Sequence, residues 1–312
     1  MLGVFGKSWK VGELKLNPDI IYINADKIHR FEDNVVPVIW VPKAIDPDEY
    51  VVDIYGDKHL FAFDNSGCIA NPKIIGRTIK IINKIAELGY SEVLLDALRL
   101  PSPFDKNLFL TTCFCKHSLK IYPKLGELRD LIKNVIEDAD AKSLRNIFME
   151  LARARAYHVK NILSILSKKA VQLGLKLSAA VFPYPLSRYV GQEPDVMKNY
   201  LNEVHVMLYH KCFGAACLNA EYKNLFELLK TLKLDYNGLK EIFQHMTGFR
   251  IDSDATKYFT EGLGIKYIEE ALEANRRIYG DKFIPILWLD DRLESNLQKF
   301  LDKYEKLDLF IP

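Results

Sequence analysis

The segment Val93 to Ser102 carries two side chains that could take part in catalysis. Its sequence, VLLDALRLPS, is an apolar run that delivers Asp96 and Arg99 just before Pro101 and Pro103. The carboxyl ends of parallel strands carry the active site in α/β folds, so a buried strand ending in these groups is typical of catalysis. The structural alternative is that Asp96 pairs with Arg99 as a brace for the following turn. We favour the functional interpretation because strand-end ionisable groups cluster at functional sites.

The residues before this strand predict a helix that would help to position it. Asn71 and Pro72 can cap and start the helix, apolar residues recur on one face of it, and Gly89 can end it. A helix, a glycine and a buried strand together form one half-turn of an α/β fold. The segment therefore predicts a parallel sheet with helical crossovers.

Apolar runs alternate with helical patterns along the rest of the chain. Strands are expected at Ile20–Asn24, Val36–Val41, Val93–Asp96, Leu175–Phe182, Val204–Tyr209 and Phe283–Leu289, with a weaker one near Phe249. Further helices are expected at 141–174, 219–232, 265–279 and 294–306. Gly56 and Asp57 lie between two short runs and predict a β-hairpin insertion near residues 50–64. The pattern predicts an α/β fold of the (β/α)8 TIM-barrel type, with residues 1–312 as a single domain.

Composition restricts the class of protein. Nearly half of the 312 residues, 49%, are hydrophobic, which is enough for a large core, and the net charge of +2 gives no support to nucleic-acid binding. No apolar run approaches the roughly 20 residues that cross a bilayer, and the first residues lack the apolar core of a signal peptide. We therefore expect a cytoplasmic protein without membrane or nucleic-acid partners. Abundant Lys, Glu and Ile with little Gln suit a thermophile.

Several segments, in this order along the chain, resemble the glycoside-hydrolase-like (β/α)8 barrels. The matching segments are Cys68–Pro72, Leu94–Pro101, Cys113–Cys115, Ala180–Pro183, Val190–Gln192 and Val206–His210. They cover roughly residues 65 to 220, and their order is more specific than any single segment. The resemblance implies that Asp96 and Arg99 lie at the C-terminal mouth of a barrel and that the substrate is a carbohydrate.

Glycoside hydrolysis needs two carboxyl groups, one of which protonates the leaving oxygen while the other acts as nucleophile or activates water. Asp96 supplies one. We rank Asp290 as the second, above Asp291 and Asp26, because Trp288 lies two positions earlier on the same side of the strand and could stack on a sugar ring. The alternative is that acids at this point only cap the next helix. A further alternative is Glu193, on an expected loop.

Other side chains at the expected strand ends are suited to bind sugar hydroxyl groups and rings. Tyr209 and His210 end one strand, and Phe182 ends another. We assign substrate binding to Arg99, Tyr209, His210, Phe182, Trp288 and Gln192. The structural alternative for each is packing, or in the case of His210 a buried imidazole bonded to the backbone.

The cysteine pattern argues against a metal site. Cys113 and Cys115 are separated by one residue, whereas structural zinc sites usually begin with cysteines two to four apart. We therefore expect that no metal is held by Cys113 and Cys115 together with Cys68, Cys212 or Cys217, and that the five cysteines are free thiols. No cofactor is expected.

Taken together, these features predict a glycoside hydrolase that acts on an unidentified carbohydrate by carboxylate acid/base chemistry. The alternative is a non-catalytic carbohydrate-binding or scaffold protein on the same barrel. A lyase or isomerase for phosphorylated metabolites is disfavoured, since no glycine-rich phosphate loop follows Leu289.

Overall fold

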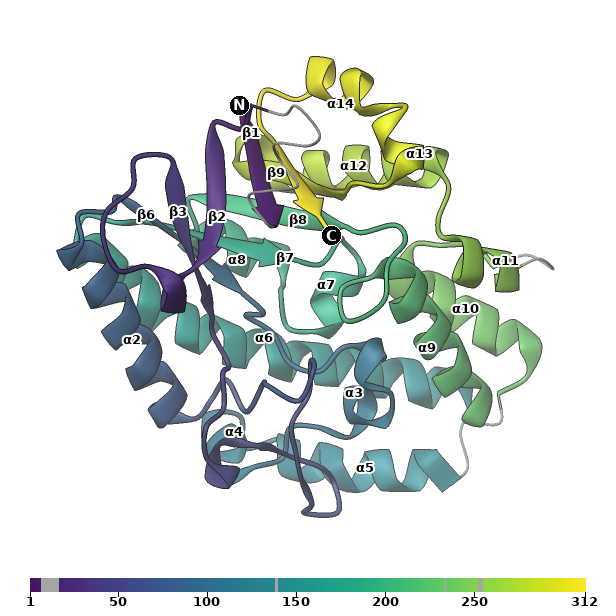
Figure 1. Cartoon of the computed structure of the whole chain (residues 1–312). Coiled ribbons are helices and arrows are strands. Elements are labelled where there is room, and N and C mark those ends of the chain that lie inside the picture. Colours follow the sequence, from purple (N-terminus) through teal and green to yellow (C-terminus); the bar gives the residue numbers. More distant parts are fainter. Residues whose placement is uncertain (7–16, 138–139, 233, 252–254) are drawn as a thin grey trace.

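Eight parallel strands close into a barrel that is surrounded by helices (Figure 1). The computed structural model describes residues 1–6, 17–137, 140–232, 234–251 and 255–312. In order around the barrel, the strands are β1 (Leu2–Gly6), β10 (Leu307–Ile311), β9 (Phe283–Trp288), β8 (Glu203–Leu208), β7 (Lys176–Val181), β6 (Glu92–Asp96), β3 (Val35–Trp40) and β2 (Ile20–Asn24). The predicted (β/α)8 barrel is therefore confirmed.

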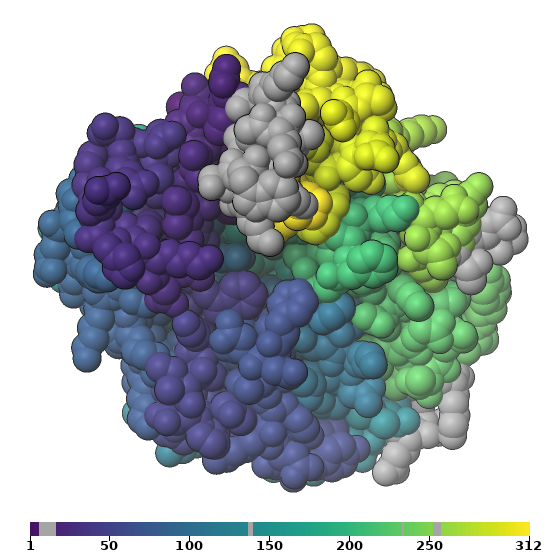
Figure 2. Space-filling view, viewed as in Figure 1, coloured from purple at the N-terminus to yellow at the C-terminus, as the bar shows by residue number. Residues whose placement is uncertain are grey.

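The first and last strands close the barrel, and neither was predicted from the sequence. They pair in parallel and lie side by side in Figure 1, and Figure 2 shows the purple N-terminal and yellow C-terminal parts of the chain on the same upper side of the molecule. Asp308 interrupts the apolar pattern of β10, but its carboxylate is buried and hydrogen-bonded to His205 Nδ1 at 2.6 Å. A Cβ at Gly3 in β1 would lie 2.1 Å from Asp308 Oδ1, so this glycine makes room for the buried acid.

Helices cover the outside of the barrel and extend its loops. They are α2 (Pro72–Glu87), α3 (Asn107–Thr111), α4 (Lys116–Ile121), α5 (Leu125–Glu137), α6 (Ala141–Gln172), α7 (Leu186–Tyr189), α8 (Pro194–Tyr200), α9 (Leu218–Thr231), α10 (Tyr236–Thr247), α11 (Ala255–Glu261), α12 (Ile265–Tyr279), α13 (Asp291–Glu294) and α14 (Leu297–Lys303). The loop between β6 and α6 contains three of them, α3 to α5, and forms the lower part of the molecule in Figure 1. This excursion follows Asp96 directly.

Two predicted elements differ from the structure. The helix expected at 294–306 is two helices, α13 and α14, because the side chains of Ser295 and Asn296 both donate to the carbonyl of Arg292 and end the first one. The weak strand near Phe249 is wrong. Gly248 ends α10 in the left-handed conformation, and Phe249 packs its ring against neighbouring tyrosines instead of pairing with a strand.

The predicted hairpin is present as a short antiparallel pair, β4 (Val51–Val52) and β5 (Lys58–His59). Asp53 shapes the turn, since its Oδ1 accepts the backbone N–H groups of residues 55, 56 and 57 at 2.8 to 3.0 Å.

The four residues expected at one end of the barrel do lie there. Asp96 and Trp288 end β6 and β9, while Phe182 and Tyr209 directly follow β7 and β8. Because all four strands are parallel members of one closed barrel, their carboxyl ends form a single mouth. Within the described residues, no helix is both long enough and apolar enough to cross a membrane.

Candidate active site

Asp96 lies at the barrel mouth in a setting that disfavours its charge. It pairs in register with Trp40 of β3, and the next residue, Ala97, adopts a left-handed backbone with φ 54°. That conformation is uncommon for a residue with a Cβ and is concentrated at functional sites. It lets the Ala97 N–H donate to Asp96 Oδ1 at 2.7 Å. Burial raises the pKa of Asp96, while this hydrogen bond and the charge of Arg99 act in the opposite direction.

Aromatic rings from the neighbouring strands form one wall of the mouth. Tyr209 lies 5.7 Å from Trp288 and 5.4 Å from Phe310 of β10 between ring centroids, and the latter two rings are stacked at 4.9 Å. Trp288, Phe310 and Asp96 are partly exposed, whereas Tyr209 is buried. Burial is the main cause that raises the pKa of Tyr209, and the negative charge of Asp96 raises it further. The phenol therefore stays neutral and keeps a proton to donate.

Arg99 does not form the brace with Asp96 that we considered as the structural alternative. Its Nη1 lies 3.7 Å from Asp105 Oδ2 and donates to the carbonyl of Leu100 at 3.0 Å. The guanidinium lies 5.2 Å from the ring centroid of Phe182 and is itself only 3% exposed. The buried charge of Arg99 lowers the pKa of Asp96 without a direct ion pair. A direct contact between Arg99 and substrate stays a prediction.

Asp290 and His210 lie together at the ends of β9 and β8. Asp290 Oδ1 accepts the N–H of Leu293 at 3.0 Å and caps α13, while its Oδ2 lies 3.0 Å from His210 Nε2. The capping role that we weighed for this pair of acids therefore belongs to Asp290. Burial lowers the pKa of His210, although the Asp290 carboxylate opposes the shift. The side chain of Asp290 remains 27% exposed.

Phe182 and Gln192 lie deeper than the sequence suggested, and both are fully buried. Gln192 Oε1 accepts the Phe182 N–H at 2.8 Å, and its Nε2 donates to the carbonyls of Leu98 and Ala180 at 3.2 and 3.3 Å. Gln192 therefore ties the loop after β6 to the end of β7, and its predicted contact with substrate is untested.

The remaining acidic candidates have other partners or positions in the structure. Asp26 forms a salt bridge with Lys43 at 2.8 Å, and Glu193 forms one with Arg188 at 2.9 Å. Asp291 begins α13.

The fold can now be compared with those of known proteins. The sequence matches no protein-family model and no curated protein. Among solved structures, the glycoside hydrolase domain of PgaB (BpsB) from Bordetella bronchiseptica matches with a TM-score of 0.53 at 11% identity, over 100% of this chain and 93% of that one. The chain therefore shares the (β/α)8 barrel fold of that domain. The glycoside hydrolase domain of PelA from Pseudomonas aeruginosa matches at 13% identity over 100% and 94% of the two chains, with a TM-score of 0.48.

Sequence reasoning missed a buried acid that supports the mouth from α9. Glu221 accepts the Ser102 hydroxyl and the Ala216 N–H at 2.9 Å through Oε1, and the Phe104 N–H at 2.7 Å through Oε2. Burial raises its pKa to about 7, while the charge of Arg99 opposes the shift. Glu221 joins the loops after β6 and β8. A glutamate in the first turn of a helix carries no sequence signal that distinguishes this role from ordinary helix capping.

The cysteines also differ from expectation. Cys212 and Cys217, in the loop between β8 and α9, form a disulfide, so the five cysteines are not all free. The loop folds back on itself, with the Leu218 N–H bonded to the Tyr209 carbonyl, and this brings the two Cα atoms to 5.2 Å. Spacing along the sequence does not reveal such a turn. Cys68, Cys113 and Cys115 are free and buried.

Proposed function

We propose that the protein is a glycoside hydrolase whose essential carboxylate is Asp96. The observation that carries this proposal is the combination of a strand-end carboxylate with a raised pKa and a wall of aromatic rings at one barrel mouth. Aromatic faces stack on the apolar faces of sugar rings, and a carboxyl group whose pKa is raised holds its proton more tightly and is suited to act as a general acid. The glycoside hydrolase fold supports the same activity by analogy only.

We assign the second carboxylate to Asp290, acting with His210. Two strands, β7 and β8, separate β6 from β9 around the barrel. This placement favours a wide gap between Asp96 and Asp290, and inverting enzymes keep their carboxyl groups roughly 6.5–9.5 Å apart, against roughly 5–5.5 Å in retaining ones. We therefore propose inversion at the anomeric carbon, with water activated between the two acids.

One observation favours the alternative of a carbohydrate-binding protein without catalysis. Both oxygens of Asp290 already have partners, one in the α13 cap and one at His210. If these contacts persist with a sugar bound, the mouth has a single free acid and can bind but not hydrolyse.

The test is turnover of a panel of aryl glycosides and oligosaccharides by the wild-type protein, with binding measured on the same panel. We expect hydrolysis of at least one member of the panel with inversion at the anomeric carbon. NMR identifies the anomer that is released first and so reports the stereochemical outcome. Binding without turnover across the panel supports the alternative, and retention of configuration excludes Asp290 as the base at a wide gap.

The charge of Arg99 predicts a measurable pH effect. Because this charge lowers the pKa of Asp96, Arg99→Met should raise that pKa. With Asp96 acting as general acid opposite Asp290 as base, the alkaline limb of kcat/KM moves to higher pH with it. Arg188→Met removes a guanidinium that pairs with Glu193 and should leave the limb in place. An unmoved limb in folded Arg99→Met would contradict the role given to this charge.

A further inference from the structure

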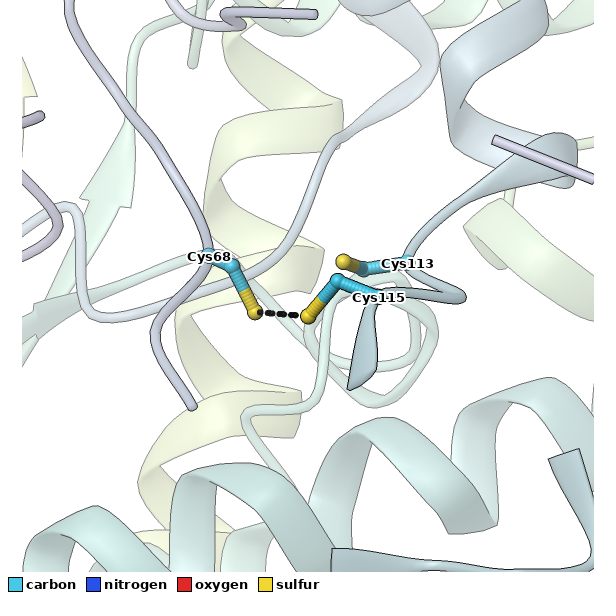
Figure 3. Close-up of side chains that lie close together, drawn as sticks. All are labelled: Cys68, Cys113 and Cys115. Carbon is cyan, nitrogen blue, oxygen red and sulfur yellow. Dashed lines mark hydrogen bonds between the residues drawn. The ribbon is translucent and has the colours of Figure 1, made fainter. Parts of the chain in front are cut away.

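Three cysteines from two distant segments meet beneath the loops of the barrel mouth. Cys68 lies in the loop between β5 and α2, while Cys113 and Cys115 lie between α3 and α4. Their side chains point toward one another in Figure 3, and the three sulfur atoms lie within 4.8 Å of one another. The Sγ atoms of Cys68 and Cys115 are 3.4 Å apart, although 47 residues separate them in the sequence.

The spacing of the sulfur atoms suits a single metal ion. Zinc binds thiolates at about 2.3 Å in tetrahedral sites, which places neighbouring sulfur atoms about 3.8 Å apart. In this cluster one pair of sulfur atoms is 3.4 Å apart and every pair lies within 4.8 Å, so small side-chain shifts reach that separation. An iron–sulfur cluster is also held by thiolates, but its several metal and sulfide atoms would have to fit between them and push them apart.

Ser118 provides a fourth position beside the cysteines. Its Oγ lies 3.3 Å from Cys68 Sγ and 3.5 Å from Cys115 Sγ, and it is fully buried. The Ser118 N–H points at Cys115 Sγ from 3.4 Å, and the Val52 N–H points at Cys113 Sγ from 3.4 Å. Backbone donors of this kind stabilise thiolate charge and orient metal ligands.

A buried positive charge lies next to the cluster. Arg155 of α6 donates to the carbonyl of Thr112, the residue before Cys113, at 2.9 Å. Three thiolates and one divalent cation carry a net charge of −1, which this guanidinium can balance within the protein interior.

We propose that Cys68, Cys113 and Cys115 bind one zinc ion, with the Ser118 hydroxyl or a water molecule as the fourth ligand. The metal would join the loop between β5 and α2 to the segment between α3 and α4. It would thereby fix the conformation of the loops that follow Asp96. This proposal differs from the expectation, based on cysteine spacing, that these residues hold no metal. The spacing rule applies to ligands that are close in sequence, whereas Cys68 comes from a distant segment. It does not depend on the protein being a hydrolase.

The experiment uses cobalt as a spectroscopic probe of the reduced full chain. Protein freed of metal by a chelator is titrated with Co²⁺, and zinc content is measured on protein purified without added metal. We expect one equivalent of each ion, with thiolate-to-cobalt charge-transfer bands and the intense visible bands of tetrahedral Co²⁺. Cys68→Ser, Cys113→Ser and Cys115→Ser should each weaken binding at least tenfold. Exchanging both Cys212 and Cys217 for serine is the matched control and should leave the spectrum unchanged.

A second variant keeps the proposal testable if the serine variants fail to fold. Ser118→Cys supplies a fourth thiolate, so it should bind Co²⁺ at least tenfold more tightly and increase the charge-transfer absorbance. The absence of stoichiometric metal in wild type and in Ser118→Cys would overturn the proposal. So would a disulfide between Cys68 and Cys115 in protein prepared under air, if that protein takes up no metal after reduction.

Discussion

Asp96→Asn should abolish most glycoside hydrolysis while leaving the protein folded. The substitution keeps the size of the side chain but removes the ionisable carboxyl group, which alone can donate a proton as general acid or act as base or nucleophile. We expect kcat/KM to fall by about 10²–10⁴ on whichever glycoside the wild type cleaves best. The measurement is turnover of the wild type and the variant side by side, with the melting temperature of each.

The stability of the same variant separates catalysis from a structural role. Burial raises the pKa of Asp96, so the native state binds this proton more tightly than the unfolded chain does. The ionised carboxylate therefore costs the native state stability at pH 7, and this cost declines as the pH falls through the folded pKa and is gone below the unfolded pKa. Asp96→Asn removes this cost, so its melting temperature at pH 7 should equal or exceed that of the wild type.

A matched aspartate provides the control. Asp26 follows the end of β2 but is exposed and paired with Lys43, and Asp26→Asn should change neither activity nor stability appreciably. Folded Asp96→Asn that keeps wild-type turnover would contradict the catalytic assignment. A marked loss of stability would instead favour a structural role for the carboxylate.

The part of the fold that the sequence predicts is the part with regular apolar patterning. β6 and α2 follow from an uninterrupted apolar run and a capped amphipathic helix, and Asn71 does cap α2 by accepting the Lys73 N–H at 2.9 Å. The strands that close the barrel break this pattern. Asp308 is a polar residue in the sequence pattern, and its hydrogen bond with His205, two strands along the barrel, explains why a charged residue is buried there.

The candidate site is predictable to the same degree. Position at a strand end locates Asp96, Tyr209 and Trp288, because strand direction alone brings them together. Partners across the mouth are set by loop conformation, which periodicity does not describe. Arg99 therefore turns to Asp105 instead of Asp96.

Arg155 is the buried charge that holds these loops, and its loss should be the most destabilising substitution that we predict. Its guanidinium donates to the carbonyls of Tyr189 at 2.5 Å, Thr112 at 2.9 Å and Pro101 at 3.5 Å, and also to that of Phe109. Arg155→Met leaves all four without this donor, at about 1–3 kcal/mol for each that stays unsatisfied. Relief of the buried charge, whose burial lowers the pKa of Arg155 to about 9, offsets part of this loss. We expect a net loss of about 3–5 kcal/mol in the free energy of unfolding.

Arg153 provides a control on the same helix. It lies two residues away, its side chain is 63% exposed, and its ion pair with Glu150 lies on the surface. Arg153→Met should change stability by no more than about 0.5 kcal/mol. Arg155→Lys separates charge from geometry, since one ammonium keeps the charge but cannot reproduce the planar fork that reaches several carbonyls. If denaturant unfolding finds Arg155→Met as stable as Arg153→Met, water or loop rearrangement satisfies the carbonyls. In that case the loops of the mouth, including the one that follows Asp96 and carries Arg99, do not depend on α6 for their conformation.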